Sequence, residues 1–177
     1  MNTKNILLSG FGGQGILFAG KFLAYKGMFE GKEVSWLPSY GPEMRGGTAS
    51  CSVIISDEKV GSPIVSNPNI LVAMNLPSLD KFESSVEKGG IIIADSTLIE
   101  RKVMRDDVTT YYVPATKLAS DNGFPTLANM IIVGKLLDIL GEADEENIAS
   151  LIKKIIPPKH ADMAEVNLKA IKIGREN

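Results

Sequence analysis

Apolar residues recur along this chain with two different spacings, which predict alternating strands and helices. Short apolar or alternating runs between glycine, proline and polar residues are typical of strands. They predict strands at residues 4–9, 33–37, 48–56, 70–74, 91–94 and 108–113. Apolar positions three and four residues apart predict helices over 15–29, 77–88, 114–120, 126–140, 145–155 and 163–173. This alternation predicts an α/β fold, a three-layer α/β/α sandwich, in a single domain over residues 1–177.

The predicted sheet is largely parallel, and a mixed sheet stays open as an alternative. Residues 91–94 form an almost continuous apolar run, as expected of a strand that is covered on both faces. In Rossmann-like sheets of this kind, ligands bind where the carboxyl ends of the strands meet. We therefore expect the segments 10–15, 40–47, 74–75 and 95–96, which follow predicted strands, to lie at one edge of the sheet.

The first of these segments is a glycine-rich turn. Gly10, Gly12 and Gly15 have the spacing G-x-G-x-x-G between a predicted strand and a predicted helix, which is typical of a phosphate-binding turn. A tight turn without a ligand is the alternative. Residues 34–38 carry no Asp or Glu to bind a ribose, which disfavours an NAD-dependent dehydrogenase. A nucleotide-bearing ligand such as coenzyme A, held mainly by its phosphates, stays compatible with the turn.

The second glycine-rich segment joins the second and third predicted strands. It reads Tyr40-Gly41-Pro42-Glu43-Met44-Arg45-Gly46-Gly47. Arg45 has the forked geometry that binds a carboxylate or phosphate through two hydrogen bonds, and Glu43 could orient it or meet a basic residue of a partner. A solvated Glu/Arg pair on a surface loop is the alternative, because exposed pairs are common and contribute little.

Composition narrows the function classes. The 177 residues carry a formal net charge of −2 with scattered lysines, which argues against nucleic acid as a partner. No apolar run approaches the roughly 20 residues of a membrane span, and the N-terminus lacks a signal-peptide core, so we expect a cytoplasmic protein without membrane contact. Cys51 and His160 are the only residues of their types. They exclude an internal disulfide, a four-cysteine iron–sulfur site and a histidine-rich zinc site within this sequence.

The two glycine segments, in this order, resemble the gamma subunit of 2-oxoacid:ferredoxin oxidoreductases. Gly10-Phe11-Gly12-Gly13-Gln14-Gly15 and residues 40–47 carry the resemblance, together with Ser50-Cys51-Ser52-Val53 and Gly61-Ser62-Pro63. It continues through Asn75-Leu76-Pro77, Asp95-Ser96 and the helix that contains Asn129-Met130, and so covers essentially the whole chain. The family includes the pyruvate, 2-oxoglutarate and branched-chain oxoacid enzymes.

The resemblance implies an accessory subunit of an enzyme that oxidatively decarboxylates a 2-oxoacid, forms an acyl-coenzyme A and reduces ferredoxin. It implies alpha and beta subunits, with a delta subunit in some members, as partners, and ferredoxin through the complex. It also implies that thiamine diphosphate with Mg and iron–sulfur clusters lie in those partners, and that this chain alone binds no cofactor or metal and carries no catalytic residue. The expected ligand- or partner-facing residues are Gly12, Gly13, Gln14, Gly15, Tyr40, Gly41, Pro42, Glu43, Met44, Arg45, Gly46, Gly47, Asn75, Asp95 and Ser96.

Three further positions, and the function itself, allow more than one interpretation. Cys51 lies in an alternating strand, where a buried and inert thiol is expected, and His160 is expected in an exposed loop. The segment 95–97 is either a helix or turn cap, or a polar patch that faces a ligand. A freestanding nucleotide-binding module without oxoacid chemistry is the alternative function, and a purely structural assembly subunit is a third.

Overall fold

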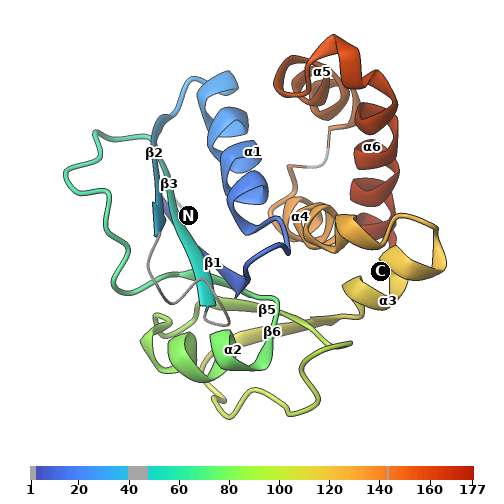
Figure 1. Cartoon of the computed structure of the whole chain (residues 1–177). Helices are drawn as coiled ribbons and strands as arrows, with labels where there is room; N and C mark the ends of the chain where they lie inside the picture. Colours follow the sequence, from blue (N-terminus) through green and yellow to red (C-terminus); the bar gives the residue numbers. More distant parts are fainter. Residues whose placement is uncertain (1–2, 40–47, 143) are drawn as a thin grey trace.

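A six-stranded sheet organises the computed structural model, which describes residues 3–39, 48–142 and 144–177 (Figure 1). Its strand order is β2-β3-β1-β4-β5-β6. The strands are β1 (Thr3–Phe11), β2 (Glu33–Ser39), β3 (Thr48–Ser56), β4 (Ile70–Ala73), β5 (Ile91–Asp95) and β6 (Thr109–Val113). Each lies where the apolar pattern predicts a strand, with ends that differ by at most two residues.

The sheet is mixed, and one strand accounts for this. β1, β4, β5 and β6 pair in parallel, whereas β3 is antiparallel to both β1 and β2. Five of these strands therefore share a direction and β3 opposes them. The prediction of a largely parallel sheet that could be mixed is confirmed. β2 and β3 are consecutive and adjacent, which is the arrangement that favours an antiparallel pair.

Helices cover both faces of the sheet, and six α-helices are described. They are α1 (Ile16–Phe29), α2 (Leu76–Phe82), α3 (Ala115–Asp121), α4 (Ala128–Ile139), α5 (Glu145–Ile155) and α6 (Ala161–Glu176). The predicted helix over 77–88 ends at Phe82 and continues as a 3-10 turn, Glu83–Ser85. The helix predicted from residue 126 begins at Ala128, because a 3-10 turn precedes it at Pro125–Leu127.

The two faces of the sheet are covered unequally (Figure 1). Ile6, Leu8 and Ile93 of the strands belong to the larger core, which they share with α1, α3 and α4 and, further out, α5 and α6. The next residues along the strands, such as Leu7 and Ile92, point to the other face and pack with α2 and the residues after β5. Successive side chains of a strand point to opposite faces, so this alternation produces the two cores of an α/β/α sandwich.

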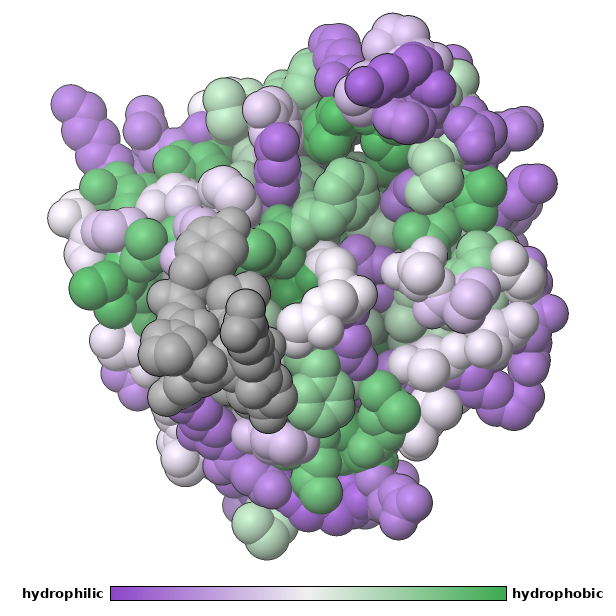
Figure 2. All heavy atoms as spheres, in the orientation of Figure 1, coloured by the Kyte–Doolittle hydropathy of each residue, from purple (hydrophilic) through white to green (hydrophobic). Residues whose placement is uncertain are grey.

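The carboxyl ends of β1, β2, β4, β5 and β6 share one edge of the sheet, as their common direction requires. In the orientation of Figure 1, Figure 2 shows hydrophobic and hydrophilic side chains interspersed, with hydrophilic ones gathered over α5. Phe11, Leu76 and Leu98 follow or end the adjacent strands β1, β4 and β5, and each is more than a third exposed. The edge therefore carries exposed apolar side chains beside its glycines.

Candidate functional site

The turn between β1 and α1 has a defined backbone shape. The Gln14 N–H donates to the Phe11 carbonyl at 3.2 Å, and the Gln14 side-chain oxygen accepts from the Phe11 N–H at 2.6 Å. Gly13 and Gly15 have φ angles of 94° and 72°. Residues with a Cβ rarely adopt such angles, so the two glycines permit this turn.

Two amide side chains tie the turn to neighbouring segments. Gln14 Nε2 donates to the carbonyl of Met74, the residue after β4, at 3.1 Å. Asn129 Nδ2, in the first turn of α4, donates to the carbonyl of Gly15 at 3.0 Å. These hydrogen bonds connect the turn after β1 to the end of β4 and to the start of α4, at the carboxyl edge of the sheet.

Among the described residues, no side chain caps the N-terminus of α1. Gly15 occupies its N-cap position, no side-chain hydrogen bond caps the helix, and its first turn contains no acidic residue. A hollow of about 180 Å³ adjoins it, lined mainly by Phe11, Gly12, Gly13, Gly15, Leu17 and Phe18. The partial positive charge of a helix N-terminus and its N–H groups favour an anionic oxygen group at such a place.

Asn75 lies at the end of the neighbouring strand β4 and caps α2. Its Oδ1 accepts from the Ser78 N–H at 2.8 Å, and Ser78 Oγ in turn lies 2.9 Å from Ser9 Oγ of β1. Asn75 is 1% exposed, and its Nδ2 has no hydrogen-bond partner among the described residues. It belongs to the same edge as the glycine turn, and its role toward a ligand or partner stays a prediction.

Asp95 is fully buried at the end of β5, and its carboxylate forms hydrogen bonds with other residues of the chain. Its carboxylate accepts from the N–H groups of Thr97 at 3.0 Å and Thr116 at 3.1 Å, and from the Thr116 hydroxyl at 2.5 Å. The Ser96 N–H donates to the Val113 carbonyl. These are the bonds of a turn and helix cap, one of the two alternatives for this segment. Contact of Asp95 and Ser96 with a ligand or partner stays a prediction.

The second glycine segment, residues 40–47, lies outside the described residues, and so do its candidates Tyr40, Glu43 and Arg45. The residues that flank it are placed: Ser39 pairs with Ser50, and Thr48 pairs with Phe11. Both flanking residues therefore lie at the same edge of the sheet as the β1–α1 turn. The predicted roles of residues 40–47 stay predictions.

Cys51 and His160 differ in their exposure. Cys51 is 1% exposed against α1, and burial raises the pKa of its thiol to about 12, although a hydrogen bond with Trp36 opposes the shift. His160 is exposed. The expected burial of Cys51 and exposure of His160 are confirmed, although His160 ends a 3-10 turn, Pro158–His160, instead of lying in a loop. Within the described residues, His, Cys, Asp and Glu form no group of three or more that could hold a metal ion. Among the described helices, none combines the length and apolar character of a membrane span.

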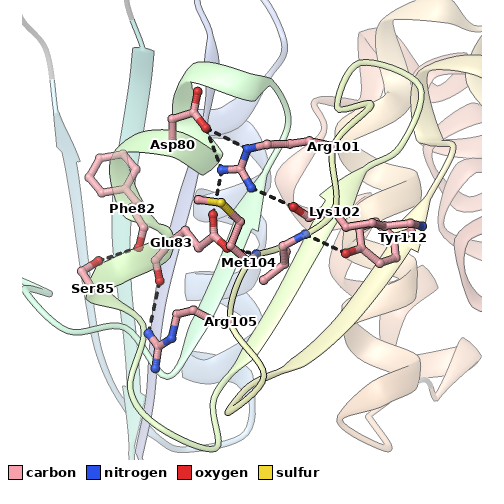
Figure 3. A network of polar contacts seen from close by, with 10 residues as sticks. Asp80, Phe82, Glu83, Ser85, Arg101, Lys102, Met104, Arg105 and Tyr112 are labelled. Atoms are coloured by element: carbon pink, nitrogen blue, oxygen red, sulfur yellow. Dashed lines mark hydrogen bonds and ion pairs between the residues drawn. The ribbon is translucent and has the colours of Figure 1, made fainter.

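A separate polar network lies on the α2 face and is structural (Figure 3). Glu83 is 4% exposed and accepts from Arg101 Nη2 at 2.7 Å and from the Met104 N–H. Arg101 also bonds to Asp80, and Arg105 donates to the Glu83 carbonyl. The network fastens the segment after β5 onto α2. Both carboxylate oxygens of the buried Glu83 accept hydrogen bonds, so neither is free to act as a base.

Asn129 was not among the site residues expected from the sequence, although it lies beside the glycine turn. The signal was present as one amide in residues 128–134, which are otherwise apolar or glycine. An apolar helix that buries an amide has to satisfy it, and this one does so on the β1–α1 turn.

Comparisons with known proteins show the family to which the chain is similar. Residues 5–177 match the family described as pyruvate ferredoxin/flavodoxin oxidoreductase. The chain is 42% identical to the ketoisovalerate oxidoreductase subunit VorA of Methanothermobacter thermautotrophicus over 97% of its own length and 35% of that protein. It thus spans about a third of this relative. It is 36% identical to the 2-oxoglutarate synthase subunit KorC of Methanocaldococcus jannaschii, over 98% of this chain and 92% of that one.

A solved structure shares the fold. The crystal structure of the keto/oxoacid ferredoxin oxidoreductase gamma subunit from Geobacter sulfurreducens superimposes with a TM-score of 0.84 at 28% identity. The match covers 99% of this chain and 96% of that one. The alternative of a freestanding nucleotide-binding module finds no support among these relatives.

Proposed function

Because the chain belongs to the pyruvate ferredoxin/flavodoxin oxidoreductase family, we propose that it is the gamma subunit of a 2-oxoacid:ferredoxin oxidoreductase. The observation that carries the proposal is its likeness, nearly end to end, to a 2-oxoglutarate synthase subunit and to an oxoacid ferredoxin oxidoreductase gamma subunit. In the proposed reaction a 2-oxoacid and coenzyme A give an acyl-coenzyme A, carbon dioxide and a proton, and two electrons pass to ferredoxin. Which oxoacid is used is left to experiment, since these relatives differ in their named substrates.

The proposed partners are alpha and beta subunits, with a delta subunit in some complexes. The VorA relative supports such an assembly, because a region similar to this chain makes up about a third of one longer polypeptide there. Thiamine diphosphate with Mg and the iron–sulfur clusters are proposed to lie in the partners. Within the described residues, the single buried thiol does not fit an iron–sulfur cluster, and His, Cys, Asp and Glu form no group of three or more that could hold a metal ion.

The proposed contribution of this chain is the carboxyl edge of its sheet. Gly12, Gly13, Gln14 and Gly15 would face the coenzyme A side of the shared active centre, together with residues 40–47. The uncapped N-terminus of α1 and the adjoining hollow support binding of an anionic group there. Phe11, Leu76 and Leu98 support a partner surface, because exposed apolar side chains gathered at an edge are typical of contacts between proteins.

Affinity purification of a tagged chain from its native source tests the proposal. We expect alpha and beta subunits carrying thiamine diphosphate to copurify, and the complex to reduce ferredoxin only with coenzyme A and a 2-oxoacid. Pyruvate, 2-oxoglutarate, ketoisovalerate and indolepyruvate are assayed separately. A mock purification from an untagged strain controls for background activity. Recovery of the chain alone under gentle conditions, or a complex inactive with all four acids, would reject the proposed function.

A further inference from the structure

We propose that Asn129 is a positioning residue that holds the β1–α1 turn so that the N-terminus of α1 meets an anionic group of a substrate. The inference rests on the proposed function, which supplies two such groups, a phosphate of coenzyme A and the carboxylate of the 2-oxoacid. Asn129 touches neither of them. It acts through the backbone of Gly15.

The contact between Asn129 and Gly15 is close and specific. Asn129 is 3% exposed, and its Nδ2 donates to the Gly15 carbonyl at 3.0 Å. A Cβ on Gly15 would lie 2.4 Å from that nitrogen, so the carboxamide packs directly against the glycine. Gly15 has a φ of 72° and forms the N-cap of α1, so Asn129 holds the residue at which the chain turns into the helix.

Only half of the buried Asn129 amide is paired. Asn129 Oδ1 is buried and has no hydrogen-bond partner among the described residues. An unpaired buried acceptor is destabilising, and an apolar side chain of similar shape, such as leucine, would avoid the penalty. Asn75 and Asn167 each carry one unpaired buried amide atom as well, so Asn129 is distinguished by its bond to Gly15, which no apolar residue could make.

The local geometry indicates what the held turn binds. The N-terminus of α1 has no side-chain cap, and no atom of the described residues lies within 4 Å of the position that a Cβ on the nearby Gly13 would take. The adjoining hollow of about 180 Å³ is smaller than the roughly 300–1,000 Å³ of a complete small-molecule site. It therefore has room for one group of a larger substrate, whose remainder other parts of the complex would bind, and the uncapped helix N-terminus favours an anionic group there.

The chain contains a matched control for this residue. Asn167 of α6 is 2% exposed, its Nδ2 donates to the Met163 carbonyl at 2.7 Å, and its Oδ1 likewise has no partner among the described residues. It is thus a buried, half-satisfied amide like Asn129, but its bond lies within one helix. Asn129→Leu removes a buried amide and its hydrogen bond to the turn, and Asn167→Leu removes the same groups within α6.

The test uses the assembled complex with each variant and measures kcat and KM. We expect Asn129→Leu to raise the KM for one substrate about tenfold, with kcat within about twofold. The reason is that a displaced α1 N-terminus would lose a hydrogen bond to the charged group of that substrate. An increase for coenzyme A identifies the phosphate, and one for the oxoacid identifies the carboxylate. Asn167→Leu should change neither KM. Equal KM values in the wild type and Asn129→Leu, or equal changes in both variants, would overturn the inference.

A second variant covers the case in which Asn129→Leu does not assemble. Asn129→Asp keeps the shape of the side chain but cannot donate to Gly15 when ionised. We expect amide hydrogen exchange at residues 11–19 to become faster in this variant and exchange at residues 163–175 to stay unchanged. Unchanged exchange at 11–19 would refute the positioning role. This measurement needs no turnover, so it separates failure of the inference from failure of the proposed function.

Discussion

Two glycines of the β1–α1 turn share a positive φ but differ in their surroundings. Among the described residues, no atom lies within 4 Å of the position that a Cβ on Gly13 would take, whereas a Cβ on Gly15 would meet Asn129 at 2.4 Å. Gly13→Ala should therefore cost only the left-handed backbone strain, about 1–2 kcal/mol. Gly15→Ala should cost that strain plus an overpacking penalty of ~1–3 kcal/mol. Urea unfolding of both variants measures the difference, and equal losses would contradict it.

The same steric argument supplies a control at the residue level. In the double variant Gly15→Ala with Asn129→Ala, the clashing carboxamide is gone, and only the backbone strain of the substituted turn residue and the lost hydrogen bond remain. Residues in direct contact couple, so the loss in the double variant should be smaller than the sum of the two single losses. An additive result would show that the two residues do not press on each other.

Single residues differ in how well the sequence predicted them. The burial of Cys51 followed from its place in an alternating strand, and the exposure of His160 from its place beside prolines. The capping alternative for Asp95 followed from the Asp-Ser-Thr run after a strand. Asn129 stands out in the sequence as an amide in an apolar run, but its partner Gly15 is 114 residues away in the chain, and no local pattern reports that contact.

The crossing of α4 and α6 depends on two glycines. A Cβ on Gly134 would lie 2.0 Å from the Ile171 carbonyl oxygen, and one on Gly174 would lie 1.8 Å from the Ile131 carbonyl oxygen. The two helix backbones are in direct contact, so Gly174→Ala must force them apart. Alanine is the better helix former by about 1 kcal/mol, yet we expect a net loss of stability of ~1–3 kcal/mol from the clash.

Thermal unfolding tests the prediction for Gly174. The control is Gly61→Ala, because no atom of the described residues lies within 4 Å of a Cβ at that position and its φ is not positive. It should leave the midpoint unchanged or raise it slightly, as glycine replacements without strain do. A rise in midpoint for Gly174→Ala would mean that α4 and α6 are not in backbone contact.

Elements were more predictable than their ends and their pairing. An apolar run such as residues 91–94 of β5 directly indicates burial on both faces, so the sequence predicted the strands. The strand order was not, because the place of β3 between β2 and β1 depends on contacts between distant segments. The helix over 77–88 ended early for a similar reason. Glu83 follows Phe82 and bonds to Arg101 and to the Met104 N–H, which lie 18 and 21 residues further on.

At the scale of the whole molecule, Glu142 joins three parts of the chain. It follows α4 and pairs with Lys4 of β1 and, at 2.8 Å, with Lys26 of α1. Burial would raise the pKa of Glu142, but the hydrogen bonds from Lys26 and Lys4 outweigh burial and hold the pKa below its ordinary value of 4.5. The ionised carboxylate is thus favoured in the folded chain.

The lowered pKa of Glu142 makes the stability of the fold sensitive to acid. A carboxyl with a lower pKa in the folded than in the unfolded state stabilises the fold above about pH 4.5, and this contribution is lost as the pH falls through the folded pKa. Urea unfolding of the wild type and Glu142→Gln from pH 7 to 3 should therefore show a gap that is constant above pH 4.5 and shrinks below it. Asp138→Asn, at the looser Asp138–Lys135 pair of 3.5 Å, should show almost no gap. If the gap for Glu142→Gln persisted unchanged to pH 3, the carboxylate would not be held ionised by its two lysines, and the link between β1, α1 and α4 would have to rest on packing alone.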